Sequence, residues 1–283
     1  MPTWPRLSAL ALLLAAAPAP SPAADSVVYK RIADRELMLF IEKPPGWKAS
    51  DRRPAVVFFF GGGWVGGTPA QFLPQSRYLA SRGLLGIRAA YRTLSPTDPG
   101  PPTTCCADAK SALRFVRGRA PELGIDPQRL AAAGGSAGGH LAAFTALVEG
   151  LDDPQDNLAL SCRPNALLLF NPVFDNGPGQ WGHDRVGSRY REFSPAHHIG
   201  PHAPPTLVFL GDQDALIPLS TLQRFESNMK LAGARCETRV FTGAAHGFFN
   251  REPYLTQTLI QADRFLASLG WLSGEPTLQP PPP

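Results

Sequence analysis

Short apolar runs recur along the chain from residue 54 onward, and most of them are continuous rather than alternating. Continuous apolar runs of strand length are typical of strands that are buried on both faces of a parallel sheet. We expect such strands at residues 54–60, 83–91, 129–134, 166–170, 206–211 and 236–241.

Segments with helical periodicity separate these apolar runs. We expect helices at residues 69–82, 106–120, 137–149, 219–233 and 254–269. Strands that alternate with helices predict an α/β fold, a doubly wound and mostly parallel sheet flanked by helices. The segment 123–129, which contains Asp126 and Pro127, is typical of a turn between a helix and a strand.

Three segments fall outside this alternation. Residues 172–205 form a long irregular insert, and such inserts in a compact domain are often lids or binding loops. Residues 273–283 are rich in proline, so we expect a disordered tail. Residues 1–23 hold an apolar run followed by small residues and prolines, which is typical of a signal peptide. We therefore expect one α/β domain over residues 24–272 in a secreted or periplasmic protein.

The composition limits the kinds of partner. The chain has 283 residues, of which 43% are hydrophobic, and a formal net charge of +4. No block of Lys or Arg stands out, so we expect no nucleic-acid partner. The apolar run in the leader is too short to span a bilayer, so we expect no membrane span. The sequence does not indicate an oligomeric state.

The four cysteines are spaced unlike the ligands of a zinc site. Export permits disulfides, but four cysteines allow three pairings and the sequence does not choose among them. We expect core thiols with at most one bridge. These residues are Cys105, Cys106, Cys162 and Cys236.

One serine stands within a cluster of glycines between a predicted strand and a predicted helix. The segment Gly134-Gly135-Ser136-Ala137-Gly138 matches G-x-S-x-G, the strained turn known as the nucleophile elbow. The residues two positions to either side of the serine must lack Cβ, because a side chain there would collide with the turn. The helix N-terminus that follows favours developing negative charge. The pattern predicts Ser136 as a nucleophile.

A serine hydroxyl needs a base, and the base needs an acid that orients it. In this architecture the chain order is serine, acid, histidine. His246 follows the strand expected at 236–241, so it is the candidate base. Two aspartates follow the strand expected at 206–211. We favour Asp214 as the acid and expect Asp212 to form the turn.

The other histidines do not fit the chain order of a catalytic base. His140 lies inside the helix after the elbow and faces away from such a role. The remaining four lie in the insert, where we expect loop or substrate-facing residues and no metal centre: His183, His197, His198 and His202.

A glycine-rich loop follows the first predicted strand, in the segment FFFGGGWVGG. Glycines let a backbone approach a reacting carbonyl closely, and backbone amides stabilise the oxyanion that forms there. We expect the amide of Ala137 and amides of this loop, at residues 60–67, to do so. A phosphate-binding loop is not indicated, because no Lys-Ser/Thr pair follows. No cofactor or metal is expected.

These motifs together resemble the secreted carboxylesterases and acetyl-esterases of the α/β-hydrolase superfamily. The hormone-sensitive-lipase-like esterases and the related acetylxylan and feruloyl esterases are the nearest in kind. The resemblance covers about residues 50–270 and rests on FGGGW, YRTLSP, ELGIDPQRLAAAGGSAGGHLAA, NPV, SPAHHI, PPTLVFLGDQDALIP and HGFF. It implies Ser136 as nucleophile, His246 as base and Asp214 as acid. It also implies the amides of Gly62, Gly63 and Ala137 as donors to the oxyanion.

The resemblance also implies a substrate class, namely small-acyl esters, acetyl or feruloyl, of polysaccharides or similar alcohols. Three aromatic residues could stack on sugars or aromatic acids: Trp64, Trp181 and Tyr190. Two positions depart from the family pattern. Phe60 stands where the oxyanion loop usually has histidine, and Gly135 stands where an acidic residue is common.

Two other functions remain open on the sequence. A serine peptidase of the prolyl-peptidase type has a similar elbow, although such enzymes usually carry an additional propeller domain. A non-catalytic binding protein on a hydrolase fold is the second alternative, because fold alone does not give function. Phe60 is the one feature that favours it.

Overall fold

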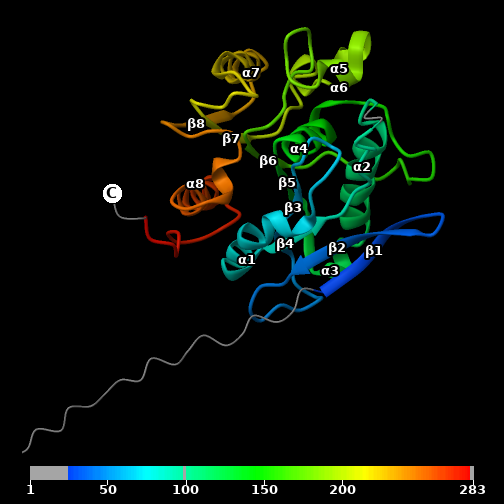
Figure 1. Ribbon diagram of the computed structural model, residues 1–283. Helices are drawn as coiled ribbons and strands as arrows, with labels where there is room; N and C mark the ends of the chain where they lie inside the picture. Colours follow the sequence, from blue (N-terminus) through cyan, green and yellow to red (C-terminus); the bar gives the residue numbers. More distant parts are fainter. Residues whose placement is uncertain (1–24, 98–99, 281–283) are drawn as a thin grey trace, which may run out of the picture.

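An eight-stranded sheet runs through the centre of the protein (Figure 1). The computed structural model describes residues 25–97 and 100–280, so the expected signal peptide lies outside the described residues. The strand order is β1-β2-β4-β3-β5-β6-β7-β8; β2 is antiparallel to both of its neighbours, β1 and β4, and all other neighbouring pairs are parallel. The strands are β1 (Asp25–Ile32), β2 (Arg35–Glu42), β3 (Arg53–Phe59), β4 (Leu85–Ala89), β5 (Ile125–Gly135), β6 (Ala166–Phe170), β7 (Thr206–Gly211) and β8 (Cys236–Phe241).

Helices cover both faces of this sheet (Figure 1). One face packs against α2, α4 and α7, and the other packs against α1 and α8. The helices are α1 (Leu73–Ser81), α2 (Thr103–Gly118), α3 (Ala120–Leu123), α4 (Ala137–Leu147), α5 (His183–Val186), α6 (Tyr190–Phe193), α7 (Leu219–Leu231) and α8 (Tyr254–Ser268). The expected doubly wound α/β fold is confirmed.

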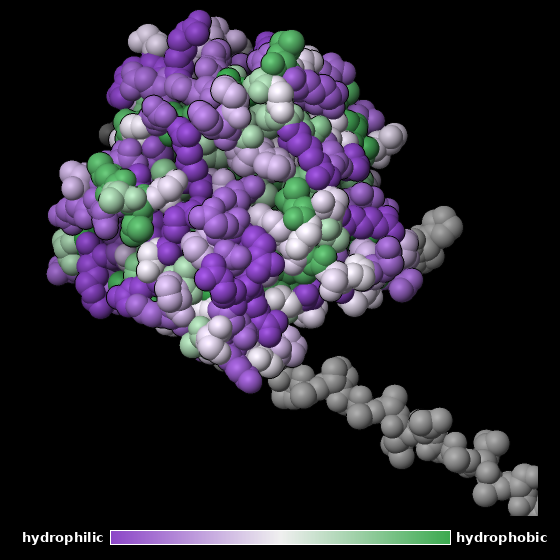
Figure 2. All heavy atoms as spheres, turned by 180° about the vertical axis from the view of Figure 1, so that it is seen from behind, coloured by the Kyte–Doolittle hydropathy of each residue, from purple (hydrophilic) through white to green (hydrophobic). Residues whose placement is uncertain are grey.

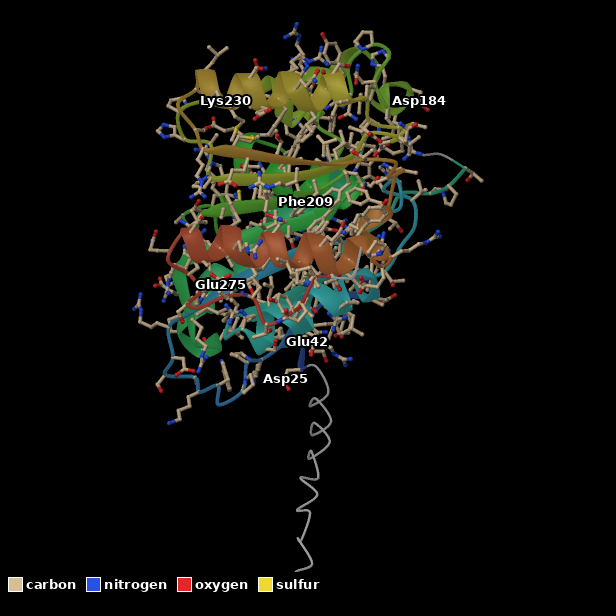
Figure 3. The ribbon with its side chains drawn as sticks, turned by 90° about the vertical axis from the view of Figure 1, so that its left-hand side faces the viewer. Asp25, Glu42, Asp184, Phe209, Lys230 and Glu275 are labelled. Atoms are coloured by element: carbon tan, nitrogen blue, oxygen red, sulfur yellow. The ribbon has the colours of Figure 1, made fainter. Side chains whose placement is uncertain are left out.

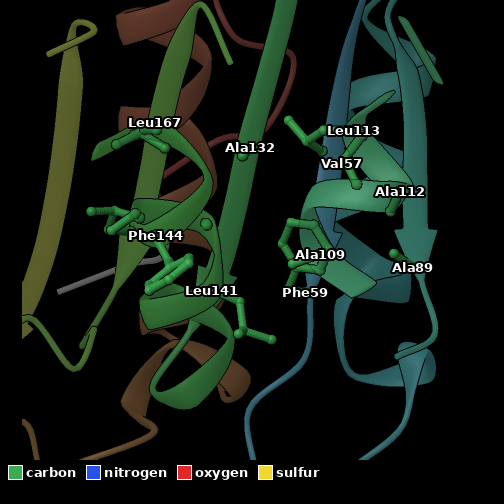
Figure 4. Packing of buried hydrophobic residues seen from close by; sticks show 14 of the residues in the cluster. Val57, Phe59, Ala89, Ala109, Ala112, Leu113, Ala132, Leu141, Phe144 and Leu167 are labelled. Atoms are coloured by element: carbon green, nitrogen blue, oxygen red, sulfur yellow. The ribbon is translucent and has the colours of Figure 1, made fainter. Parts of the chain in front are cut away.

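The alternation of side chains along each central strand divides the core into two apolar clusters. Val57 and Phe59 of β3 belong to the cluster on the α2 and α4 side, which Figure 4 shows together with Leu141 of α4. Val56 and Phe58, which alternate with them along β3, belong to the opposite cluster. Phe209 of β7 also lies in that second cluster, and Figure 3 shows it between α7 and α8. Burial on both faces explains why these strands are apolar without alternation.

The first two strands were not expected from the sequence. β1 and β2 form an antiparallel hairpin in which exposed and buried residues are mixed. Only strands that are buried on both faces produce a continuous apolar run, so this half-exposed hairpin escaped the pattern. The six expected strands are all present, and β6, β7 and β8 begin and end at the expected residues.

The segment expected as a turn at 123–129 is instead largely part of β5. Ile125 already pairs with Arg53, and the register shifts before Leu130 pairs with Ala55. The turn chemistry is nevertheless present, because the Asp126 side chain accepts a hydrogen bond from the amide of Gln128. The extra residues are therefore absorbed as an irregularity inside the strand.

The insert at 172–205 and the start of the C-terminal tail, which lie outside the alternation of strands and helices, also have definite positions. Residues 172–205 contain α5, α6 and short 3₁₀ turns. The expected disorder of the 273–283 tail does not hold for 273–280. Arg82 donates hydrogen bonds to the carbonyls of Ser273 and Gly274, and Leu278 packs against the apolar cluster under α8.

The described cysteines are all free thiols, and three of them are buried. Burial raises the pKa of the Cys105 and Cys236 thiols to about 12. Thiols with such pKa values are almost entirely protonated at neutral pH and are poor nucleophiles.

Hydrophilic residues dominate the face shown in Figure 2, where the hydrophobic residues form small separate patches. Among the described residues, no helix has both the length and the apolar character needed to cross a membrane.

Candidate active site

The turn between β5 and α4 holds Ser136 in strained backbone geometry. Its φ is +53°, a backbone angle that residues other than glycine rarely adopt. A Cβ on Gly134 would lie 2.3 Å from the Gly138 oxygen, and a Cβ on Gly138 would lie 2.0 Å from the Phe59 oxygen. The expectation that both positions must lack Cβ is confirmed. The turn is therefore possible only with glycine at these two places.

Three side chains from separate strand ends meet at this turn. The Ser136 hydroxyl lies 2.8 Å from His246 Nε2, and His246 Nδ1 lies 2.7 Å from Asp214 Oδ2. The carboxylate can only accept, so Nδ1 carries the proton and Nε2 is free to accept the serine hydrogen. The side chain of Asp214 is fully buried. This arrangement can remove a proton from Ser136 and keep the resulting imidazolium paired.

The two aspartates after β7 have different partners. Asp214 Oδ1 accepts hydrogen bonds of 2.9 Å from the amides of Leu216 and Ile217, which leaves Oδ2 for His246. Asp212 instead accepts a hydrogen bond of 2.8 Å from the amide of Gly243. Asp212 thus ties the turn after β7 to the turn after β8, and Asp214 faces the histidine.

The glycine-rich loop after β3 is held in place by its carbonyl groups. The Gly62 carbonyl accepts from the amides of Val65 and Gly66 at 3.1 and 3.0 Å, and the Trp64 carbonyl accepts from the amide of Leu94 at 2.8 Å. Arg185 donates to the Gly63 carbonyl. Among the described residues, the amides of Gly62 and Gly63 have no acceptor.

The amide of Ala137, at the start of α4, also lacks an acceptor within the described part of the chain. The amides of Gly62 and Gly63 belong to a loop that contacts the elbow, because a Cβ on Gly61 would lie 3.4 Å from Ser136 Cβ. Unpaired amides beside a serine hydroxyl are the donors that an oxyanion requires.

Phe60, which replaces the usual histidine, is anchored by packing. Its ring stacks on Tyr91 with a centroid separation of 4.0 Å, and the Tyr91 hydroxyl donates to the Phe60 carbonyl at 2.7 Å. The next amide, that of Gly61, donates to Gln71 Oε1 at 2.7 Å. The loop therefore keeps a fixed backbone without a histidine at position 60.

A cavity of about 270 Å³ opens beside Ser136. Its lining includes the three loop glycines, His246 and four side chains from other parts of the chain: Trp181, Leu216, Phe249 and Asn250. Of the three aromatic residues expected to face a substrate, Trp181 lines this cavity. Trp64 is fully buried, with its ring against those of His140 and Trp181, and Tyr190 packs against His183 and His197. Trp64 and Tyr190 thus have packing roles.

Asn171 is a site residue that the sequence analysis missed. It follows β6, is fully buried, and has a φ of +34°. Its side-chain oxygen accepts a hydrogen bond of 3.1 Å from the amide of Gly247, and its Nδ2 lies 3.3 Å from His246 Nε2. Asn171 therefore holds both the ring of the candidate base and the backbone beside it. Its motif, NPV, carried no sign of that contact.

Gly135 has a steric reason for its identity. A Cβ at this position would lie 2.3 Å from Cζ of Phe249, whose ring lines the cavity and stacks on Phe72 at 5.5 Å. The acidic residue that is common here in related esterases would collide with the same ring.

Replacing Gly135 by alanine should lower the free energy of unfolding by about 1–3 kcal/mol, because the Phe249 ring must move within a packed cluster. Urea denaturation would measure the change. The matched control is the same substitution in a Phe249→Ala background, where the space is open and the cost should largely disappear. An equal cost in both backgrounds would contradict the steric explanation.

His140 is a fully buried histidine on α4, and it is not one of the three side chains that meet at Ser136. Its Nε2 lies 2.6 Å from the Phe193 carbonyl, so this nitrogen carries the proton. Its ring packs edge-on against Trp64 at 4.9 Å. Burial lowers the pKa of His140 from 6.5 to about 4. The side chain therefore connects α4 to α6 as a neutral group.

Acid should destabilise the fold through His140. The unfolded chain takes up a proton near pH 6.5, whereas the folded chain does so only near pH 4. Between these values the unfolded state binds more protons, so the free energy of unfolding falls as the pH drops. We expect a loss of about 2 kcal/mol from this group between pH 7 and pH 5. Urea titrations at both pH values should show a smaller loss for His140→Gln, and an equal loss would contradict the assignment.

The insert histidines have other partners. His183 Nδ1 lies 2.8 Å from the Asn176 carbonyl, and His197 Nε2 lies 3.2 Å from Asp175. Within residues 25–97 and 100–280, no group of three or more His, Cys, Asp and Glu side chains is placed to hold a metal ion.

Two family models match overlapping parts of the chain. The model described as BD-FAE matches residues 41–167, and the model described as the prolyl oligopeptidase family matches residues 107–268. Among curated proteins, Esterase LipC of Mycobacterium tuberculosis is 26% identical over 82% of this chain. Esterase LipQ of the same organism is 27% identical over 76% of this chain. The chain spans only 64% and 55% of the length of these two relatives.

Solved structures of Thermogutta terrifontis esterase 2 match more completely. The apo form is 45% identical, covers 91% of this chain and 99% of that chain, and has a TM-score of 0.85. Further structures of the same esterase are described as propionate bound and as phosphorylated by paraoxon, with TM-scores of 0.84. The prolyl oligopeptidase family belongs to the α/β-hydrolase superfamily. Together with the strand order and the elbow geometry, these matches show that the chain belongs to the esterases of that superfamily.

Proposed function

We propose that the protein hydrolyses carboxylic esters of small acyl groups through an acyl-enzyme on Ser136. The observation that carries the proposal is the unbroken line of hydrogen bonds from Ser136 through His246 to Asp214. Nucleophile, base and orienting acid all lie within hydrogen-bond reach, as nucleophilic catalysis requires.

The reaction proceeds in two steps on these groups. Ser136 Oγ attacks the ester carbonyl while His246 Nε2 takes its proton, and the oxyanion is held by the amides of Gly62, Gly63 and Ala137. His246 then gives the proton to the departing alcohol, which leaves the acyl group on Ser136. Water repeats the sequence and releases the acid.

The size of the cavity supports a small acyl group. Its volume of about 270 Å³ lies below the ~300–1,000 Å³ of pockets that enclose drug-sized ligands. Trp181, Leu216 and Phe249 supply apolar lining. The related esterase described as propionate bound, and a further structure described as butyrate bound, suggest the same range of acyl lengths. A feruloyl group fits this volume less readily than an acetyl group.

The natural alcohol and the location of the protein belong to the same proposal. A leader-like segment at 1–23 favours export, and an exported small-acyl esterase would meet acetylated polysaccharide outside the cytoplasm. Trp181, which lines the cavity, is an aromatic side chain that could contact a sugar ring.

Hydrolysis of p-nitrophenyl esters from acetate to decanoate tests the proposal. We expect kcat/KM to peak at acetate to butyrate and to fall for longer chains. Paraoxon should also phosphorylate the wild-type protein once per chain and leave Ser136→Ala unmodified, with mass spectrometry as the readout. Absence of any serine-dependent ester hydrolysis would overturn the proposal.

The match to the prolyl oligopeptidase family favours one alternative, a serine peptidase that uses the same three residues. A proline-containing dipeptide p-nitroanilide separates the two functions. Release of p-nitroaniline at a rate comparable to that of acetate hydrolysis would favour the peptidase, and its absence would favour the esterase.

A further inference from the structure

Arg185 reaches from the irregular insert to the glycine-rich loop. It lies on α5, and its guanidinium donates a hydrogen bond to the carbonyl of Gly63. The two residues are separated by 122 positions in the sequence. The bond therefore joins the insert directly to the loop whose amides flank Ser136.

Two indole rings hold this guanidinium in place. Its central carbon lies 5.7 Å from the Trp64 ring centroid and 5.3 Å from the Trp181 ring centroid. These distances are typical of cation–π contacts, which a planar guanidinium makes well. Trp64 is fully buried with a φ of +63°, and Trp181 lines the cavity beside Ser136. The donor is thus fixed before substrate arrives.

The segment that carries Arg185 is itself tied to the domain. Asn176 Nδ2 donates to the Trp181 carbonyl at 3.0 Å, and the Asn176 carbonyl lies 2.8 Å from His183 Nδ1. Gln180 accepts a hydrogen bond of 2.9 Å from Thr221 of α7. These contacts lie at the N-terminal end of α5, and the one from Thr221 attaches the segment before α5 to the long helix α7. The insert therefore has the geometry of a fixed support.

The carbonyl that Arg185 holds belongs to the peptide between Gly63 and Trp64, which directly follows the peptide that carries the Gly63 amide. The Gly62 carbonyl and the Gly63 amide belong to the same planar peptide. Two amides already hold that carbonyl, so the direction of the Gly63 amide is fixed as well. Arg185 fixes the next peptide through its carbonyl. The guanidinium also brings a permanent positive charge to this loop, since Arg185 Nη1 would lie 3.9 Å from a Cβ on Gly63. Phe60 offers no hydrogen bond to this loop from its side chain.

We propose that Arg185 is a positioning residue, which clamps the Gly63–Trp64 peptide and thereby restrains the adjoining peptide that carries the Gly63 oxyanion amide, in a loop that lacks the usual histidine. This inference rests on the proposed esterase function. Segment 172–205 then acts on the reaction through the oxyanion loop, as a permanent part of the catalytic site.

Kinetics of three variants with p-nitrophenyl acetate test the clamp. Arg185→Met keeps an apolar stem between the indoles and removes the donor and the charge, so kcat should fall about 100-fold with KM changed less than about threefold. Arg185→Lys keeps the charge but loses the planar fork, so kcat should fall about tenfold. The control is Arg189→Met, an exposed arginine of the same segment that pairs with Glu192, and it should match the wild type.

Three results would overturn the clamp. They are a kcat for Arg185→Met within threefold of the wild-type value, a loss of kcat that only mirrors a loss of folded protein, and an equal loss in Arg189→Met. If Arg185→Met does not fold, Arg185→Lys decides: a tenfold lower kcat at unchanged Tm supports the clamp, and a wild-type kcat overturns it. A wild-type protein without esterase activity would refute the proposed function itself. An active wild type with an equally active Arg185→Met would refute the clamp alone.

Discussion

Replacing Ser136 by alanine is expected to lower kcat for p-nitrophenyl acetate by a factor on the order of 10⁶. The reason is that the Ser136 hydroxyl lies 2.8 Å from His246 Nε2, beside amides of the glycine-rich loop that have no acceptor in the described part of the chain. Without the hydroxyl, an ester bound in the cavity meets a base and oxyanion donors but no nucleophile. Steady-state hydrolysis assays at saturating ester would measure the loss.

The fold should survive this substitution, which makes the result interpretable. Alanine keeps the Cβ that the turn already accommodates at a φ of +53°. The single hydrogen bond that is lost has a net worth of about 1 kcal/mol. The free energy of unfolding should therefore change little in urea titrations. Retention of more than a hundredth of the wild-type kcat would show that another residue attacks the ester.

The sequence was most informative where chemistry and backbone geometry are local. Gly134 and Gly138 indicate the elbow because the turn brings their backbones too close to other backbone atoms for a Cβ: Gly134 lies against the Gly138 oxygen, and Gly138 lies against the Phe59 oxygen of β3. The chain order of serine, acid and histidine then limits the partners, because parallel strands place their carboxyl ends at one edge of the sheet. The structure brings Ser136, Asp214 and His246 together at that edge.

The sequence was silent where a contact joins distant segments. Asn171 meets His246 across 75 positions, and Arg185 meets Gly63 across 122. Asparagine and arginine are common in loops, so nothing in the local pattern distinguishes these two from solvated neighbours. The fold alone supplies the missing information, because only packed strands and helices determine which loops share an edge.

The aromatic residues illustrate the same limit. The sequence does not distinguish Trp64 from Trp181 as a residue that contacts substrate. In the structure, Trp64 is fully buried and Trp181 lines the cavity. The half-exposed hairpin of β1 and β2 is a comparable case at the level of the fold. Burial depends on what the rest of the chain places above a residue, and periodicity does not encode it.

Replacing Asp214 by asparagine is expected to lower kcat by about 10⁴-fold while KM changes little. Asp214 Oδ1 accepts from the amides of Leu216 and Ile217, so the asparagine oxygen must take that place. The asparagine NH₂ group then faces His246 Nδ1, which must become an acceptor. The ring proton moves to Nε2, where it prevents His246 from taking the serine proton. Initial rates with p-nitrophenyl acetate would measure the loss.

Asp212→Asn provides the matched control, because it makes the same chemical change two residues away. Asp212 accepts one hydrogen bond, from the amide of Gly243, and asparagine keeps an oxygen for it. We expect kcat to stay within about threefold of wild type, since this turn touches neither Ser136 nor the loop amides. Equal losses of kcat in the two variants would mean that the reaction depends on the hydrogen bonding of the turn after β7, and not on the tautomer of His246. A large loss confined to Asp212→Asn would transfer the role of the acid to the other aspartate.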